Sequence, residues 1–261
     1  MILSASLEQT LLFLPFSLGL LLSYRIARLT DLTVESSFLM GPAIFVNLLA
    51  YMPTWLALVF GAMGGLITGG FVSLIQNHDR MTSLMAGIIS VFMFFSINLL
   101  IMGRPHIPVT VYMPVWINGV IVSMIVIFLY TLLRSQVGLK LKAFGDNSNL
   151  FQELFHKKEA YRTLALCISN ILACVSGLLT TLHQGYIDLY MNQGLSLLGI
   201  GTVLVAGALI TESIVKQVLA CAFVVFSYFF SSHMFLMLDV STIYLRLLIG
   251  VVLIAMLRSK S

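Results

Sequence analysis

Long apolar stretches, separated by short polar ones, follow one another along almost the whole chain. A helix needs about 20 apolar residues to cross the hydrocarbon core of a bilayer, so the pattern predicts an all-α, polytopic membrane protein with about nine transmembrane helices, within a range of about eight to ten. The expected spans are 9–25, 37–52, 54–76, 82–103, 110–133, 163–183, 194–211, 217–238 and 241–257.

The second of these stretches is the least regular. It is short, and Pro42 and Pro53 interrupt it. Proline removes a backbone donor and bends or ends a helix, so this stretch is expected to be tilted, re-entrant or interrupted. Irregular backbone of this kind is tolerated at membrane depth only where it lies against protein or a water-lined cavity.

Composition supports the same class. Of the 261 residues, 59% are hydrophobic and 9% are charged, and the mean hydropathy is +1.03, whereas a soluble domain carries about 25% charged residues. A transmembrane β-barrel would instead show alternating segments of ~10 residues. The net charge of +4 does not indicate a nucleic-acid partner. A single transmembrane domain over 1–261 is expected.

The basic residues predict an orientation. If the loop 134–162 is cytoplasmic, alternation of the spans places twelve of the fourteen Lys and Arg residues on the same side. The positive-inside rule then predicts an outer N-terminus and a cytoplasmic C-terminus. Of the remaining two, Arg104 falls in an outer loop, and Arg246 lies near the outer end of the last expected span.

The loop 134–162 itself is unusually polar, with nine of the 24 charged residues. Asn147, Ser148 or Asn149 is a candidate helix cap, and Asn149 with Gln152 fits the capping-box spacing. The helix that follows is too short to persist alone in water. Its apolar edge needs a groove, either the bilayer interface or a cleft on a cytoplasmic partner. The residues of this edge are Leu150, Phe151, Leu154 and Phe155.

Four stretches carry a resemblance to a known family. RLTDLTVESSFLMGPA (28–43), SINLLIMGRPHI (96–107), LKAFGDNSN (141–149) and LSLLGIGTVLVAGALITES (195–213) occur in this order. Together they resemble the integral membrane permease of bacterial ABC importers of the branched-chain amino acid type. The resemblance includes the subgroup linked to uptake of aromatic amino acids or related small solutes, and it extends over nearly the whole chain.

The resemblance implies an assembly in the bacterial inner membrane. Two permease subunits, here a homodimer, would form the pathway within membrane lipid, above two ABC ATPase subunits. An extracytoplasmic solute-binding protein would deliver the solute. No cofactor is expected in this chain, because ATP would be bound by the partner ATPase, and no GxxxxGK[ST] motif occurs here. The resemblance implies an ATPase-coupling segment that contains Gly145, Asp146, Asn147, Leu150, Phe151, Leu154 and Phe155.

Polar residues and glycines within the apolar stretches are candidates for the translocation pathway or a gate. They are Asp31, Thr33, Glu35, Ser37, Asn98, Asn118, Gly199 and Gly201. Asp31 and Glu35 form either an interfacial pair neutralised by Arg25 or Arg28, or a cytoplasmic gate or coupling contact. The two asparagines hydrogen-bond either a solute or a neighbouring helix.

The glycines have two interpretations as well. Gly61, Gly65 and Gly69 form an i, i+4, i+8 stripe that lets another helix approach closely. Gly199 and Gly201 favour either tight packing of the same kind or a helix that slides or bends during transport.

No catalytic or metal-binding residues are expected. The five histidines are scattered over separate segments, and neither HExxH nor GxSxG occurs. A polytopic membrane enzyme therefore lacks a catalytic constellation. The alternative to an importer subunit is a stand-alone ion-coupled carrier, which would typically place an ionisable residue near the bilayer midplane. The acidic residues cluster near span ends, which favours the importer.

Overall fold

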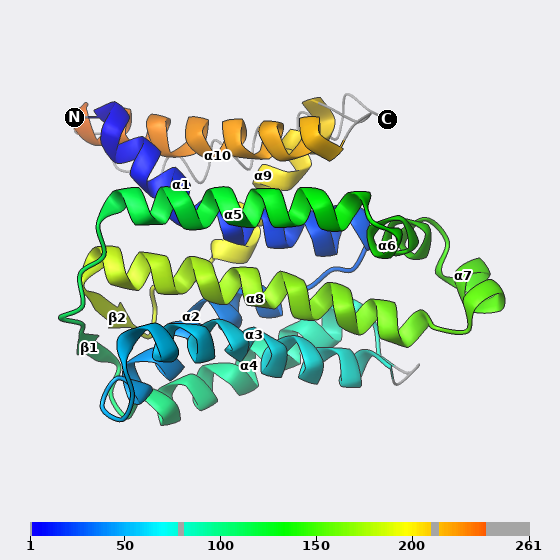
Figure 1. Cartoon of the computed structure of the whole chain (residues 1–261), viewed down its shortest axis with the longest axis horizontal. Helices are drawn as coiled ribbons and strands as arrows, with labels where there is room; N and C mark the ends of the chain where they lie inside the picture. Colours follow the sequence, from blue (N-terminus) through cyan, green and yellow to red (C-terminus); the bar gives the residue numbers. More distant parts are fainter. Residues whose placement is uncertain (1, 78–80, 210–213, 239–261) are drawn as a thin grey trace.

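The computed structural model describes residues 2–77, 81–209 and 214–238. These residues form ten α-helices, a six-residue π-helix (η1) and two three-residue strands (Figure 1). The predicted all-α class is confirmed. The elements are α1 (Ile2–Leu20), η1 (Leu21–Ile26), α2 (Thr33–Leu48), α3 (Thr54–Gln76), α4 (Ser83–Met102), β1 (His106–Pro108), α5 (Val115–Arg134), α6 (Gln136–Asp146), α7 (Ser148–Phe155), α8 (Lys158–Gln184), β2 (Tyr186–Asp188), α9 (Leu195–Leu209) and α10 (Ile214–Met237).

Six helical segments among the described residues are long and apolar enough to cross a membrane. They are Ile2–Ile26, Thr54–Gln76, Ser83–Met102, Val115–Arg134, Lys158–Gln184 and Lys216–Met237. Two other expected spans, 37–52 and 194–211, correspond to α2 and α9, which have only 16 and 15 residues. At 1.5 Å per residue these helices reach only about 24 Å and 22 Å. The ninth expected span, 241–257, lies outside the described residues.

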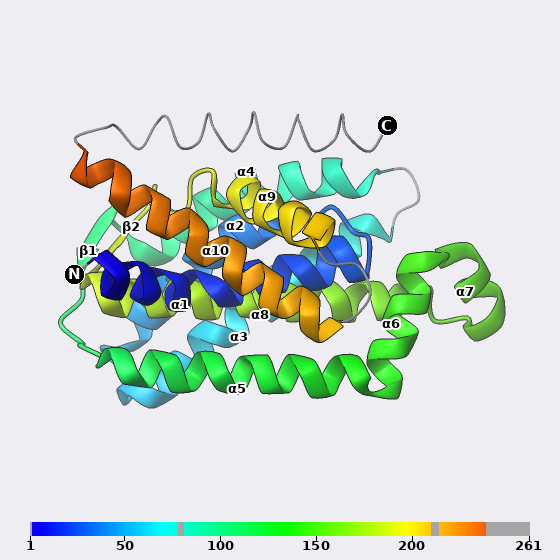
Figure 2. The same ribbon diagram turned by 90° about the horizontal axis from the view of Figure 1, so that it is seen from above.

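The long helices lie side by side as a bundle with two distinct ends (Figures 1 and 2). At one end, called the ribbon end, α1 begins and β1 pairs antiparallel with β2, with Ile107 opposite Ile187. At the opposite end, called the α7 end, α6 and α7 project beyond the bundle. The protein therefore separates a compact surface at one end from a protruding segment at the other.

Helix α8 packs against α1, α2 and α3, and glycines allow the close approach. A Cβ atom added to Gly65 would lie 2.3 Å from the backbone nitrogen of Ile171, and one added to Gly69 would lie 2.7 Å from Cα of Cys167. No side chain fits at such distances. The predicted glycine stripe is therefore confirmed as a helix-packing surface, directed at α8.

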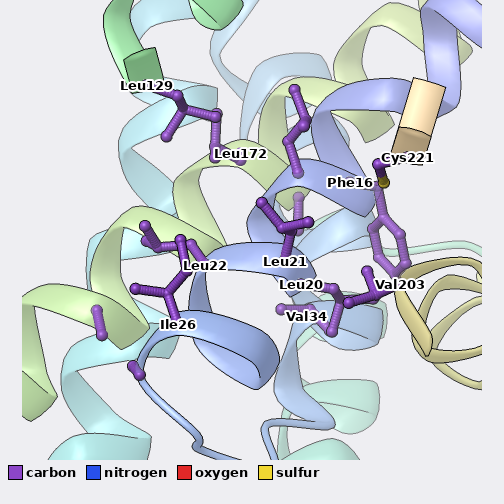
Figure 3. Close-up of a cluster of buried hydrophobic side chains, with 14 of the residues drawn as sticks. Phe16, Leu20, Leu21, Leu22, Ile26, Val34, Leu129, Leu172, Val203 and Cys221 are labelled. Carbon is purple, nitrogen blue, oxygen red and sulfur yellow. The ribbon is translucent and has the colours of Figure 1, made fainter. Parts of the chain in front are cut away.

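The largest apolar core gathers around the end of α1 (Figure 3). Phe16, Leu20 and Leu21 are fully or almost fully buried there and meet side chains of α2, α5, α8, α9 and α10. By contrast, α5 exposes large apolar side chains such as Trp116 and Phe128 along its outer face. Apolar surface of this extent needs lipid or another membrane subunit against it.

Candidate functional site

The linker 27–32, between η1 and α2, enters the interior of the bundle. Arg28 has a positive φ of 54°, which turns the chain out of the π-helix, and the Leu29 N–H donates to the Ser23 carbonyl over 2.8 Å. Asp31 follows and is completely buried against Asn170, which lies twelve residues inside α8. The linker is thus irregular backbone whose residue Asp31 is enclosed by protein. The stretch 37–52, which was expected to be tilted, re-entrant or interrupted, instead begins within the helix α2, which continues through Pro42 and ends at Leu48.

Five buried polar side chains form one hydrogen-bonded group, called here the Asp31 cluster. The Asp31 carboxylate accepts from the Thr33 N–H over 2.8 Å, from the Thr33 hydroxyl, and from Asn170 Nδ2 over 2.8 Å. Asn170 Oδ1 lies 2.5 Å from Ser37 Oγ, which lies 2.6 Å from Thr68 Oγ1. All five residues are 0% exposed. The cluster therefore joins the linker to α2, α3 and α8.

The Asp31 cluster corrects one interpretation of the sequence. Asp31 and Glu35 were expected to form an interfacial pair neutralised by Arg25 or Arg28, and this is wrong. Within the described part of the chain, Asp31 has no ion-pair partner, and its oxygens receive neutral donors instead. Arg25 donates to the Gly207 carbonyl, and Arg28 pairs with Asp146 at 3.0 Å. The two cations are close in sequence, but the π-helix and the turn at Arg28 direct them elsewhere.

Glu35 lies apart from Asp31 and joins α2 to the start of α9. Its carboxylate accepts from the backbone N–H of Gly194 over 2.9 Å and of Ser196 over 3.3 Å. Asn192 Nδ2 also donates to the Glu35 carbonyl. The first N–H groups of a helix are unpaired and carry partial positive charge, so an acidic side chain is favourable there. Glu35 therefore fixes the position at which the short helix α9 begins.

The two candidate asparagines occupy different places. Asn98, on α4, is fully buried, and its Nδ2 donates to the Ser36 carbonyl of α2 over 3.1 Å, which matches the helix–helix interpretation. Asn118, on α5, is 2% exposed. Among the described residues, neither asparagine Oδ1 has a hydrogen-bond partner, so both acceptors remain available. Asn118 does not belong to the Asp31 cluster.

The candidate glycines of α9 are packing positions in this structure. A Cβ atom on Gly199 would lie 2.3 Å from the Leu20 side chain and 2.8 Å from the Phe16 ring. Gly201 is buried on the same helix. A larger residue at Gly199 would therefore require the Leu20 and Phe16 side chains to shift.

The α6–α7 segment, Gln136–Phe155, contacts the same linker from outside. A Cβ atom on Gly145 would lie 2.0 Å from the Ile26 carbonyl oxygen, and Asp146 pairs with Arg28. Asn147 caps α7, since its Oδ1 accepts from the Leu150 N–H over 3.1 Å. The expected pairing of Asn149 with Gln152 is not formed, because α7 already begins at Ser148 and Gln152 accepts from the Lys158 N–H.

The apolar edge of α7 divides into two surfaces, which corrects the expectation of one outward edge. Leu150, Leu154 and Phe155 are 53%, 66% and 42% exposed, but Phe151 is only 2% exposed. The Phe151 ring lies 5.1 Å from the Tyr161 ring and 6.0 Å from the Phe144 ring, centroid to centroid. Phe151 therefore anchors α7 to α6 and α8. Leu150 and Leu154 remain exposed, and Phe155, whose ring lies 4.9 Å from the Phe151 ring, is exposed in part.

Sequence reasoning missed two members of the Asp31 cluster. Asn170 lies within the apolar run LALCISNILACV (164–175), and Thr68 lies within the glycine stripe of α3, directly before Gly69. A carboxamide in the middle of a membrane span is costly unless it is hydrogen-bonded. That cost was the available signal, although nothing in the sequence identifies Asp31 as the partner.

Comparison with known proteins places this architecture in a family. Residues 2–257 match the family described as the permease component of branched-chain amino acid transport systems. An uncharacterized protein of Rickettsia prowazekii (strain Madrid E) is 36% identical over 99% of this chain and 97% of its own length. The tyrosine transport system permease protein of Clostridioides difficile (strain R20291) is 27% identical over 96% of this chain and 88% of its own.

A solved structure shares the fold. PsaBC from Streptococcus pneumoniae, in complex with Fab, superposes with a TM-score of 0.54 over 89% of this chain and 80% of that chain. At 9% identity, this likeness concerns the fold alone. From the family match over nearly its whole length, the chain belongs to the permease components of branched-chain amino acid transport systems.

Proposed function

We propose that this chain is the transmembrane subunit of an ATP-driven importer that carries a small solute, an amino acid, across the bacterial inner membrane. The observation that carries the proposal is the family match over residues 2–257. The C. difficile relative, which is a tyrosine transport permease by name, supports an amino acid as the solute. In this proposal a second copy of the chain completes the pathway, and an extracytoplasmic binding protein delivers the solute to it.

The α7 end faces the cytoplasm in this proposal. Six basic residues lie between Arg134 and Arg162, on the segment that contains α6, α7 and the start of α8. The positive-inside rule assigns such a segment to the cytoplasm. The ribbon end, where α1 begins, then faces outward, and a cytoplasmic C-terminus is expected from the alternation of spans.

Coupling to a separate ATPase would occur through α7. Three exposed apolar side chains, Leu150, Leu154 and Phe155, lie on a helix that projects beyond the bundle. An exposed apolar face on a short helix is suited to a groove in a partner protein. The buried Phe151 ring holds this face in a fixed position relative to α8.

The contacts of the α6–α7 segment suggest how movement could reach the bundle. Gly145 touches the backbone at Ile26, and Asp146 pairs with Arg28, so displacement of the segment acts directly on linker 27–32. Asp31, three residues after Arg28, is hydrogen-bonded to α8 through Asn170. ATP-driven displacement of α7 would therefore change the packing of α1 and α2 on α8.

Copurification and reconstituted transport test this function. Leu154→Asp places a charge on the exposed face of α7 and is expected to remove a copurifying ATPase and ATP-driven uptake. Leu3→Asp changes an equally apolar, exposed residue at the ribbon end and is expected to retain both. Uptake by the chain alone in liposomes, driven by a proton or sodium gradient, would instead establish the ion-coupled carrier.

A further inference from the structure

A cavity of about 430 Å³ lies at the ribbon end of the bundle, within a single copy of the chain. Its wall comes from α1, α2, α8, β2, α10 and the segment that leads into α9. The volume falls within the range of about 300–1,000 Å³ that is typical of small-molecule sites. The lining residues are Gln9, Leu12, Phe13, Phe38, Thr180, His183, Gln184, Tyr186, Met191, Leu195 and Phe229.

The inner part of the cavity is apolar and rich in aromatic rings. Leu12, Phe13 and Phe38 are almost fully buried there. The Phe13 and Phe229 rings meet edge to face, with centroids 5.7 Å apart. Aromatic rings prefer offset-stacked or edge-to-face contacts with one another. This inner part of the cavity, called here the floor, therefore suits a flat, aromatic group.

The outer part of the cavity is polar. Gln9, Gln184 and Tyr186 are exposed lining residues, and His183 is partly buried. Among the described residues, no group donates to or accepts from the side-chain amides of Gln9 and Gln184. Each amide can both donate and accept, so these side chains offer unused hydrogen bonds to either an anionic or a cationic group.

The charges around the cavity favour a solute without net charge. None of the described residues that line it is a Lys, Arg, Asp or Glu. An acidic group lies next to it: Glu8 Oε2 is 4.0 Å from His183 Nε2. The ammonium group of a zwitterion could meet Glu8 while its carboxylate met His183 and the amides. A solute with a net charge of either sign would instead leave that extra charge unpaired in a partly apolar site.

We propose that this cavity binds a small zwitterionic solute that carries an aromatic ring, before it crosses the membrane. The ring would lie among Phe13, Phe38 and Phe229, and the charged head would meet Gln9, His183 and Gln184. The assignment of the solute to transport rests on the proposed function, but the binding itself belongs to this chain and can be measured without an ATPase.

Equilibrium binding of radiolabelled L-tyrosine to the purified full chain in lipid nanodiscs tests the site. Saturable binding is expected. The inhibition constant of L-phenylalanine is expected to be at least about tenfold lower than that of L-leucine or L-glutamate. The double variant Gln9→Ala, Gln184→Ala is expected to weaken binding by about tenfold or more, since both amides lose their contacts. Absence of saturable binding, or unchanged affinity in the double variant, would overturn the proposal.

A matched pair of variants on α10 distinguishes loss of an aromatic ring from the cavity from a general disturbance of the helix. Phe229→Leu removes a ring from the cavity and is expected to abolish the preference for L-phenylalanine over L-leucine. Phe223→Leu changes an exposed ring on the same helix and is expected to leave the preference for L-phenylalanine unchanged. If ATP-driven uptake in the full complex persisted while Phe229→Leu kept the preference, the cavity assignment would fail and the proposed function would stand. If uptake proved independent of ATP, the proposed function would fail, and the binding data would still decide the cavity.

Discussion

At the scale of single residues, the Asp31 cluster shows how a buried carboxyl is kept in an apolar bundle without an arginine. Asn170 is its central member, because it donates to Asp31 and its own oxygen lies next to Ser37. An amide that bridges two partners in this way cannot be replaced by an apolar side chain without leaving both unsatisfied. An unsatisfied buried polar group costs about 1–3 kcal/mol.

Asn170→Leu keeps the approximate volume of the side chain and removes both contacts. It is expected to lower the free energy of unfolding by about 1–3 kcal/mol and to reduce transport. Ser90→Ala is the control, because among the described residues the buried Ser90 hydroxyl bonds only to the Ala86 carbonyl of its own helix. Thermal unfolding in detergent, followed for both variants, measures the difference. Equal stability of the two would contradict the role of Asn170.

Phe151 and Leu154 lie three residues apart on α7 and are expected to respond differently. Phe151→Ala removes a ring packed against Tyr161 and is expected to destabilise the α6–α7 segment by about 3–5 kcal/mol, as is typical of buried aromatic rings. Leu154→Ala is expected to change stability by no more than about 0.5 kcal/mol, because its side chain is exposed. Limited proteolysis between Ser135 and Lys158 reports the local stability, and similar cleavage rates would contradict the anchoring role.

At the scale of elements, the sequence predicted the lipid-facing helices well and the interior segments poorly. The expected span 82–103 agrees within one residue with Ser83–Met102, because a helix with wide lipid-facing sides carries a long, nearly continuous apolar run. The short helices α2 and α9 were expected as spans because their sequences are apolar. Many of their apolar residues face other helices, and the sequence alone does not distinguish a residue buried in protein from one that faces lipid. The burial of Phe151 was not predictable either, because a helical period shows which residues share a face but not which face a neighbour covers.

Two glycines on α3 test whether the approach of α3 to α8 holds the bundle together. Gly65→Ala places a Cβ 2.3 Å from the Ile171 backbone and is expected to destabilise the protein by about 1–3 kcal/mol. A Cβ on Gly70 meets nothing within 4 Å, so Gly70→Ala is expected to stabilise α3 slightly, by up to about 1 kcal/mol. The midpoint of thermal unfolding measures both, and a similar loss of stability in the two variants would show that close packing at Gly65 is not required.

At the scale of the whole molecule, contacts connect the α7 end to the interior. Asp146 and Gly145 contact the chain around linker 27–32, and Asp31 of that linker is bonded to α8. The cavity at the ribbon end has Phe13 on α1, Phe38 on α2 and Thr180 on α8 in its wall. The helices that a displaced α6–α7 segment would shift are thus the helices that shape the cavity. This arrangement has a functional meaning only if the two ends lie on opposite sides of the membrane.

Thiol labelling in intact cells tests that placement directly. Tyr112→Cys introduces an exposed thiol in the loop between β1 and α5, at the ribbon end, and Leu154→Cys introduces one at the α7 end. A membrane-impermeant maleimide is expected to label Tyr112→Cys in intact cells and Leu154→Cys only after the membrane is opened, because the basic α7 end lies in the cytoplasm. The unsubstituted chain is the control, since Cys174 and Cys221 are buried and Cys167 lies within a membrane span. The reverse labelling pattern would place the α7 end outside, beyond the reach of any cytoplasmic ATPase, and would overturn the proposed coupling.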